Sequence, residues 1–229
     1  MKKFITGVAL LLTPFFTSAE IRFVSEILVG QSQYQMDSSI RREVQTEVSE
    51  ESYSTSLSSD SFGFRLGAKF TDNFSFELAK HEHGESVGYI AVSFPTALPA
   101  EGCCLGPDHD MIRVAIVPID LESIRLGVKG EIEMFSNTFV NARLGLAHWK
   151  YGEFTPHKLT AISAQSNSGE SGNDIYYSFG VEYKFTKNIF IGAEYSLFTI
   201  DEKKIFHDEL SGTYKNIVKD ISFVIGWAF

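Results

Sequence analysis

Apolar residues alternate with small, polar or charged residues in eight separate stretches of this chain. A period of two residues is typical of a β-strand with one face in an apolar environment. The chain is therefore predicted to be all-β. The expected strands span residues 21–34, 61–70, 74–83, 124–134, 140–147, 177–185, 189–197 and 214–229.

Short and long connections alternate between these strands. The short turns at 71–73, 136–137 and 186–188 carry Asn or Asp, which tolerate the backbone of tight hairpins, and aromatic residues flank them. Phe135 breaks the parity of its strand, so we expect a bulge there or a phenylalanine at the turn itself. The long connections are expected at 35–59, 84–121, 151–174 and 201–214.

Two of the long connections have a distinctive composition. Residues 35–59 are rich in Ser and Glu, which indicates a mobile, solvated surface loop. The connection 84–121 instead contains two apolar stretches, and we expect them to extend the flanking strands as a tall hairpin that pairs about Phe94 with Met111. A ten-stranded barrel is the alternative for this region.

The N-terminus has the pattern of a secretion signal. Lys2 and Lys3 precede an apolar run from Phe4 to Phe16, and small residues follow up to Ala19. We expect a signal peptide over residues 1–19 and one domain over residues 20–229, because the run is shorter than the ~20 residues that span a bilayer. Loss of the two lysines takes the formal net charge from −9 to −11, which does not favour nucleic acid as a partner.

The composition resembles that of a soluble protein, with a mean hydropathy of −0.02. A membrane-spanning β-barrel shows this composition because only alternate residues of each strand face lipid. If the apolar residues face outward, charged residues of both signs line the interior. This predicted lumen charge network comprises Glu26, Arg65, Lys69, Glu77, Arg125, Lys129, Glu131, Glu133, Arg143, Glu182, Lys184 and Glu194.

A shift of the register by one residue would turn this set toward lipid, where an Arg or Lys at the midplane costs ~2–4 kcal/mol. We therefore expect the register with its apolar face outward. Lys80 lies on the apolar side, near the rim of the long connections, where its amine can reach the headgroups.

The last strand alternates between apolar side chains and small or polar ones as far as its terminal phenylalanine. It resembles the closing strand of bacterial outer-membrane β-barrels, in which this pattern is read by the assembly machinery. The resemblance assigns that signal to Phe223, Ile225, Trp227 and Phe229.

Two further segments widen the resemblance. They are Gly145-Leu146-Ala147-His148-Trp149 and Gly180 to Thr186, the second with Asn188, Gly192, Glu194 and Tyr195. Together with the eight strands they resemble the OmpA-type transmembrane domain within the outer-membrane β-barrel family. The resemblance implies an eight-stranded antiparallel up-and-down transmembrane β-barrel with short periplasmic turns and long extracellular loops. Since no peptidoglycan-binding domain follows in this sequence, cell-wall tethering is not implied.

The candidate chemistry is limited. The adjacent Cys103 and Cys104 lie in an oxidising compartment, where they can form a vicinal disulfide, pair between molecules or bind a metal with 108–110. No closed Cys/His spacing supports a metal site, so we expect no metal and no cofactor. The six histidines, His81, His83, His109, His148, His157 and His207, are interpreted as rim and loop residues, because a catalytic triad is recognised by geometry.

We therefore expect a non-enzymatic integral protein of the cell outer membrane, with a structural, surface-interaction or adhesion role carried by its extracellular loops. The expected partners are membrane lipid and lipopolysaccharide, the assembly machinery, and host or cell-surface ligands. The alternatives are a narrow channel and an enzyme that acts on lipid A.

Overall fold

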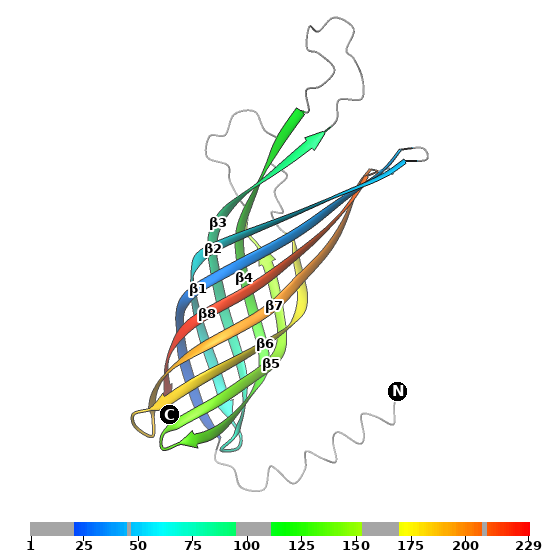
Figure 1. Ribbon diagram of the computed structural model, residues 1–229. Helices are drawn as coiled ribbons and strands as arrows, with labels where there is room; N and C mark the ends of the chain where they lie inside the picture. The colour runs from blue at the N-terminus through cyan, green and yellow to red at the C-terminus, as the bar shows by residue number, and fades with distance from the viewer. Residues whose placement is uncertain (1–20, 45–46, 95–110, 153–169, 208–209) are drawn as a thin grey trace, which may run out of the picture.

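The computed structural model describes residues 21–44, 47–94, 111–152, 170–207 and 210–229. Its eight strands are antiparallel, each pairs with its neighbours in the chain, and β1 pairs with β8 to close a barrel (Figure 1). No helix in the described ranges is long and apolar enough to cross a membrane. The strands are β1 Arg22–Val44, β2 Glu47–Lys69, β3 Phe74–Phe94, β4 Met111–Phe135, β5 Thr138–Tyr151, β6 Ser171–Lys184, β7 Ile189–His207 and β8 Leu210–Ala228.

One end of the barrel carries three tight hairpin turns, and we call it the turn end. Asn137 in the β4–β5 turn has a φ of 65°, a left-handed conformation that asparagine tolerates. The register shifts between Glu133 and Phe135, so the bulge expected from the parity of this strand is confirmed. The chain terminus also lies at this end, where Phe23 and Phe229 exchange backbone hydrogen bonds of 3.0 and 2.9 Å.

At the other end, which we call the hairpin end, the strands run much further than expected. The first two strands stay paired as far as Val44 and Glu47, so the expectation of a mobile loop over 35–59 is wrong. The loop expected at 201–214 is likewise mostly strand, since β7 and β8 pair from Ile189 and Trp227 up to His207 and Leu210. Cross-strand pairing overrides the low strand propensity of Ser and Glu in these segments.

The tall hairpin over 84–121 is confirmed. Phe94 pairs with Met111, and the segments that flank them continue β3 and β4, so the ten-stranded alternative is wrong for the described strands. In the connection expected at 151–174, β5 ends at Tyr151 and β6 begins at Ser171. The signal peptide, Cys103 and Cys104, and 108–110 lie outside the described residues.

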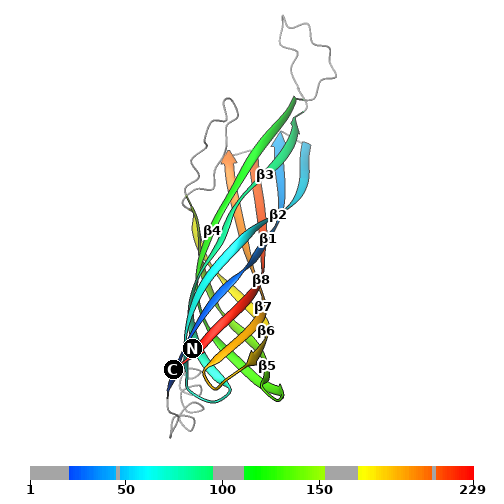
Figure 2. The same cartoon turned by 90° about the vertical axis from the view of Figure 1, so that its left-hand side faces the viewer.

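Toward the hairpin end the wall divides into two parts. The pairing of β2 with β3 stops at Phe62 and Glu82, and the pairing of β6 with β7 stops at Tyr176 and Phe198. A four-stranded sheet in the order β2–β1–β8–β7 and the β3–β4 hairpin therefore continue separately, as Figures 1 and 2 show.

The outer surface near the turn end is apolar. Large side chains on every strand are exposed there, among them Phe76, Leu126 and Phe179, at 53%, 60% and 60% of their surface. An exposed apolar surface that encircles a protein is expected only where lipid covers it. We call this zone the apolar belt, and it confirms the register with apolar residues outward.

Candidate functional site

Charged side chains fill the barrel interior at the level of the apolar belt. Arg65 forms a bidentate pair with Glu194, with nitrogen–oxygen distances of 2.9 and 2.8 Å, and a further bond of 2.6 Å with Glu26. Arg143 lies beside them, and its Nε donates to Glu77 Oε2 at 2.8 Å. All five side chains are buried.

Two more residues complete this group. Lys129 Nζ lies 2.6 Å from Glu182 Oε1 and 3.7 Å from Glu26 Oε1. Arg143 also lies 3.4 Å from Glu182 Oε1, so each cation contacts at least two carboxylates. Burial of an unpaired ion costs several kcal/mol, and shared hydrogen bonds of this kind offset that cost. We call the group the charge network; it comprises Glu26, Arg65, Glu77, Lys129, Arg143, Glu182 and Glu194.

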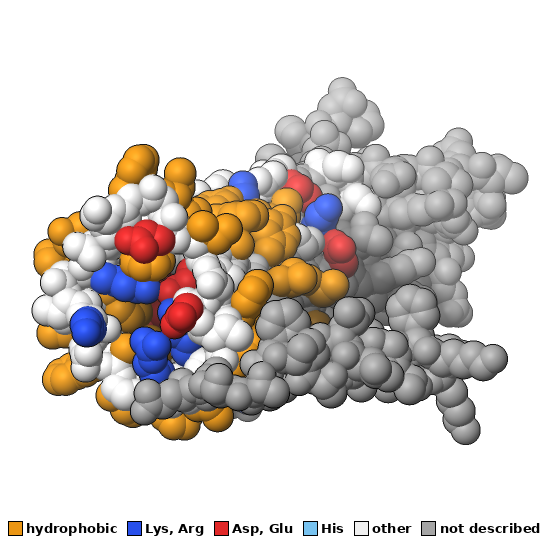
Figure 3. All heavy atoms as spheres, turned by 90° about the horizontal axis from the view of Figure 1, so that it is seen from below, with side chains coloured by type: hydrophobic (Ala, Val, Ile, Leu, Met, Phe, Trp, Pro, Cys, Tyr) orange, Lys and Arg blue, Asp and Glu red, His pale blue; other side chains and the backbone are white. Residues whose placement is uncertain are grey.

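A second group of charges lies at the mouth of the turn end. Glu131 Oε1 accepts from Lys69 Nζ at 2.6 Å and from Lys184 Nζ at 2.8 Å. Seen from below, acidic and basic side chains gather in this mouth inside a ring of apolar residues (Figure 3). A cavity of about 60 Å³ opens there. It has room for about two waters at their liquid volume of ~30 Å³ each, and its lining reaches Glu26, Glu77 and Glu182 of the charge network, so it is a small recess that ends at that network.

One member of the predicted network is placed wrongly. Glu133 keeps the register of Glu131 and pairs with Phe139, but it is the last residue before the bulge and the turn, so it is exposed at the open end of the barrel, where its carboxylate accepts from the backbone N–H of Asn137 at 3.2 Å. A carboxylate that was not predicted, Asp220, takes its place and binds Arg125 at 2.7 Å. The interior balance of six positive and six negative groups is kept in the described strands, with Asp220 in place of Glu133.

Above the charge network, toward the hairpin end, lies a layer centred on His83. His83 Nδ1 lies 2.9 Å from Asp220 Oδ1, and His83 Nε2 lies 2.9 Å from Ser123 Oγ. Ser32 Oγ donates to Asp220 Oδ1 at 2.6 Å. We call this layer the His83 cluster; it comprises Ser32, His81, His83, Ser123, Arg125, Ser196 and Asp220, all buried.

A second bulge positions His83. The β3–β4 register shifts between Glu82 and Glu85, and Gly84 has a φ of +75°. Glycine tolerates this left-handed conformation without strain. The His83 carbonyl accepts hydrogen bonds from Tyr34 Oη, at 2.7 Å, and from Ser59 Oγ.

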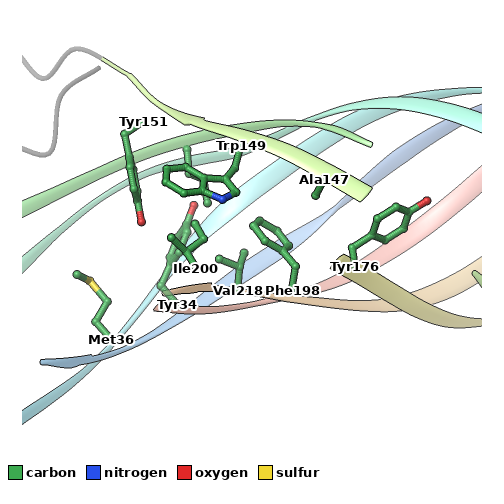
Figure 4. Packing of buried hydrophobic residues seen from close by; sticks show 10 residues of the cluster. Tyr34, Met36, Ala147, Trp149, Tyr151, Tyr176, Phe198, Ile200 and Val218 are labelled. Atoms are coloured by element: carbon green, nitrogen blue, oxygen red, sulfur yellow. The ribbon is translucent and has the colours of Figure 1, made fainter. Parts of the chain in front are cut away.

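Buried apolar side chains close the lumen above the His83 cluster (Figure 4). The ring of Tyr176 lies over a cross-strand glycine pair, where a Cβ on Gly145 would sit 2.7 Å from its Cε1 atom. The Arg125 guanidinium lies 5.5 Å from the centroid of the Tyr176 ring and 5.3 Å from that of the Phe198 ring. We call this set the apolar plug; it comprises Tyr34, Met36, Leu121, Ala147, Trp149, Tyr151, Tyr176, Phe198, Ile200 and Val218.

The sequence contains the signal that identifies the His83 cluster. His81 and His83 share the strand parity of Glu77, and Asp220 shares the parity of Ser222, so the same alternation that places the charge network also points them inward. The interpretation of His81 and His83 as rim residues is wrong. That interpretation is confirmed for His148, which is exposed and lies 3.0 Å from Asn173.

The residues assigned to the assembly signal lie together on the outer face of β8 and at the residue that follows it, Phe229. Phe223, Ile225, Trp227 and Phe229 are 50% to 67% exposed within the apolar belt. The Phe229 ring stacks on Phe23 at a centroid distance of 6.2 Å. Their outward direction is the one that the alternation predicts, and their role as a signal stays a prediction.

Among solved structures, the chain is similar to the outer membrane protein OprG from Pseudomonas aeruginosa. The two are 14% identical, the match covers 92% of this chain and 97% of OprG, and the TM-score is 0.54. The outer membrane protease OmpT from Escherichia coli matches at 10% identity over 93% and 100% of the two chains, with a TM-score of 0.47. Ail, the attachment invasion locus protein of Yersinia pestis, matches at 12% identity over 90% and 99%, with a TM-score of 0.37.

The likeness to OprG concerns the fold alone. A comparison with curated proteins finds no match. The model of the outer membrane protein beta-barrel domain matches residues 29–229, which is most of the chain and includes all eight strands in whole or in part. This protein therefore belongs to the outer membrane β-barrel family.

Proposed function

We propose that this protein is a closed outer-membrane anchor whose strands project beyond the lipid as binding walls. The observation that carries the proposal is the length of the pairing between β1 and β2, which runs from Arg22 and Lys69 to Val44 and Glu47. The outward apolar residues of this hairpin end at Val29 and Phe62, so more than half of the pairs lie past the apolar belt. Strands that only cross the membrane do not need this extension.

The asymmetry of the two ends supports an orientation. Family members have short turns on the periplasmic side and longer connections outside. We place the turns at Asp72, Asn137 and Lys187 in the periplasm and the four-stranded sheet and β3–β4 hairpin outside the cell. The apolar belt then contacts membrane lipid and lipopolysaccharide, and the projecting walls meet host or cell-surface ligands.

A channel is less well supported than an anchor. The charge network blocks the lumen at the belt, and the apolar plug fills it above, with Tyr34, Phe198 and Val218 at 0% exposure. Eight strands enclose an interior that side chains can fill. We expect only small, intermittent conductance from the wild-type protein in planar bilayers, and a stable conductance of general-porin size would refute a closed lumen.

The His83 cluster contains a Ser–His–Asp hydrogen-bond sequence, yet we propose no catalytic role for it. Ser123, His83 and Asp220 are 1%, 0% and 1% exposed, so a substrate cannot reach them in this conformation. Asp220 also binds Arg125 and Ser196 through Oδ2. We expect a fluorophosphonate probe to leave Ser123 unlabelled and purified protein to leave lipid A unchanged.

Shortening of one wall tests the proposal. Replacement of residues 38–53 by Asn-Gly would join Asp37 to Ser54, which are paired, and so keep the register below. We expect heat-modifiable protein in the outer membrane at the wild-type level, with reduced binding of whole cells to host-cell surfaces. Equal binding by the shortened and wild-type proteins would contradict a role for this wall.

A further inference from the structure

Three potential metal ligands converge in the His83 cluster. One ring nitrogen each of His81 and His83 and one carboxylate oxygen of Asp220 lie within 4.8 Å of one another. The two histidines alternate on one face of β3, their rings are 4.6 Å apart, and Asp220 reaches them from β8. Imidazole and carboxylate are donors that Zn²⁺ accepts.

The outer contacts of these residues match those that orient metal ligands. His83 contacts Ser123 Oγ through Nε2, which leaves Nδ1 directed at Asp220 Oδ1. The second oxygen of Asp220 accepts from Arg125 at 2.7 Å and from Ser196 at 2.8 Å. Ligating histidines and carboxylates are commonly held through their distal atoms in this way.

An independent observation points to a missing ligand. The Nε2 atom of His81 is buried and has no hydrogen-bond partner among the described residues, while the side chain as a whole is 2% exposed. Buried polar groups are almost always satisfied by a partner. Either a bound metal ion or a buried water would supply such a partner. The potential metal ligands nearby, a ring nitrogen of His83 and a carboxylate oxygen of Asp220, favour the ion.

We propose that His81, His83 and Asp220 bind one divalent transition-metal ion of the zinc type. In a tetrahedral site with bonds of about 2 Å, neighbouring ligand atoms are roughly 3.3 Å apart. His83 Nδ1 and Asp220 Oδ1, at 2.9 Å, are near that separation, and a small movement of the His81 ring brings the third ligand to it. Ser32 Oγ, 3.1 Å from His83 Nδ1, faces the fourth position and can hold a water ligand.

Charges of both signs lie around the site. Arg125 is the nearest cation; its Nη2 binds Asp220 Oδ2 at 2.7 Å and lies 3.3 Å from His83 Nε2, on the side of the ring away from the proposed ion. Asp220 Oδ1 accepts from Ser32 at 2.6 Å and has a second lone pair for the metal. In the adjacent charge network four carboxylates face three cations, which leaves one net negative charge beside the site, while the interior groups as a whole balance at six and six. The ion ties β3 to β8 across the lumen, at the level where the wall begins to divide.

Burial determines how the ion must enter. His83 is 0% exposed and the apolar plug covers the cluster, so loading occurs while the barrel closes. Untagged mature protein refolded into detergent with Zn²⁺ should retain one ion per chain after dialysis. With Co²⁺ it should give the visible absorption of a tetrahedral site, and chelator added after folding should remove the ion slowly.

Variants distinguish this site from adventitious binding. His83→Gln and His81→Gln should each weaken Zn²⁺ binding at least 100-fold, and Ser123→Ala about 10- to 100-fold. His148→Gln, at an exposed histidine outside the cluster, should bind as the wild type does. If either glutamine variant fails to fold, the Co²⁺ spectrum of Ser123→Ala decides, because that residue orients His83 without ligating.

The proposal is wrong if the wild-type protein retains less than one-tenth of an ion per chain. It is also wrong if a folded His81→Gln or His83→Gln variant retains the full ion, or if Ser123→Ala leaves the Co²⁺ spectrum and affinity unchanged. Any of these would indicate that a water satisfies His81 and that the cluster is held by hydrogen bonds alone.

Discussion

The two halves of this barrel are built on the same strands with opposite polarity. At the turn end β1 points Glu26 into the lumen and Ile27 toward lipid, whereas further along it points Tyr34 inward and Gln33 outward. β7 shows the same reversal, with Glu194 inside near the turn end and Phe198 inside above. The reversal shows that the surroundings decide which face is apolar: lipid covers the outside in one half and water in the other.

The His83 cluster lies at the level of this reversal. Below it paired ions fill most of the interior, beside a small buried apolar group of Leu28, Phe190 and Val224, and above it the interior is filled by packed apolar side chains. Substitutions in the ion-filled half, on the outer face and in the plug should therefore differ in their effect on stability.

The largest effect is expected in the ion-filled half. Arg143→Ala removes a cation that contacts Glu26, Glu77, Glu182 and Glu194 and leaves their charges undercompensated. Loss of one partner of a buried ion pair costs about 3–5 kcal/mol. Urea unfolding in lipid vesicles should show a loss of this size in the free energy of unfolding.

Arg22→Ala is the matched control. Arg22 pairs with Asp72 at 3.2 Å, but the two side chains are 57% and 86% exposed, so the expected loss is ~0–1 kcal/mol. Equal losses in Arg143→Ala and Arg22→Ala would show that the interior ions are as solvated as the surface pair.

A second test places a positive charge on the outer surface of each half of the barrel. Leu126→Arg points a guanidinium into the apolar belt and should cost about 2–4 kcal/mol near the bilayer midplane. Gln33→Arg makes the comparable change past the reversal and should stay within ~0.5 kcal/mol of the wild type. A similar cost for both substitutions would place lipid against both halves.

The smallest effect on the free energy of unfolding is expected when an isoleucine of the apolar plug and one of the apolar belt are each shortened. Ile200→Val removes one methylene from a side chain that is 1% exposed and should cost about 0.5–1.5 kcal/mol. Ile221→Val makes the same change on the lipid-facing surface, where mobile lipid fills the space, and should cost less. If Ile221→Val is the more costly change in the unfolding assay, the plug is not closely packed.

The polarity reversal also explains what the sequence reveals and what it hides. The outward apolar alternation, as in Phe223 and Ile225, predicts the eight strands, their register and the charge network. On β1 the outward apolar residues end at Val29, and past it the buried apolar residues Tyr34 and Met36 lie on the inner face, so the remaining half of β1 resembles a polar loop. Over 35–44 the chain pairs on one side with 47–56, the next segment of the sequence, and on the other side with β8, far along the chain; the composition of 35–44 itself reveals neither partner.

For the interior residues, too, the sequence reveals one property and hides another. Parity alone places Arg65 and Glu194 inside, but it does not show that they form a bidentate pair. The error at Glu133 arises because this residue is the last one before the bulge and the turn, where the lumen opens, so inward parity does not bury it. The omission of Asp220 and His83 arises because the predicted network was limited to the Lys, Arg and Glu residues of the interior face. Their convergence depends on a closed barrel that brings β3 and β8 to one layer.

Labelling of intact cells tests the central claim, that the strands past the reversal stand outside the cell. The test uses a variant without Cys103 and Cys104, into which one cysteine at a time is introduced. The positions are Ser54 and Ser58 on β2, and Asp72, Asn137 and Lys187 in the turns. Intact cells that carry each variant are treated with a membrane-impermeant maleimide. The account predicts labelling at Ser54 and Ser58, and labelling at the three turns only after the outer membrane is opened. Labelling of the turns on intact cells, with Ser54 and Ser58 protected, would contradict it.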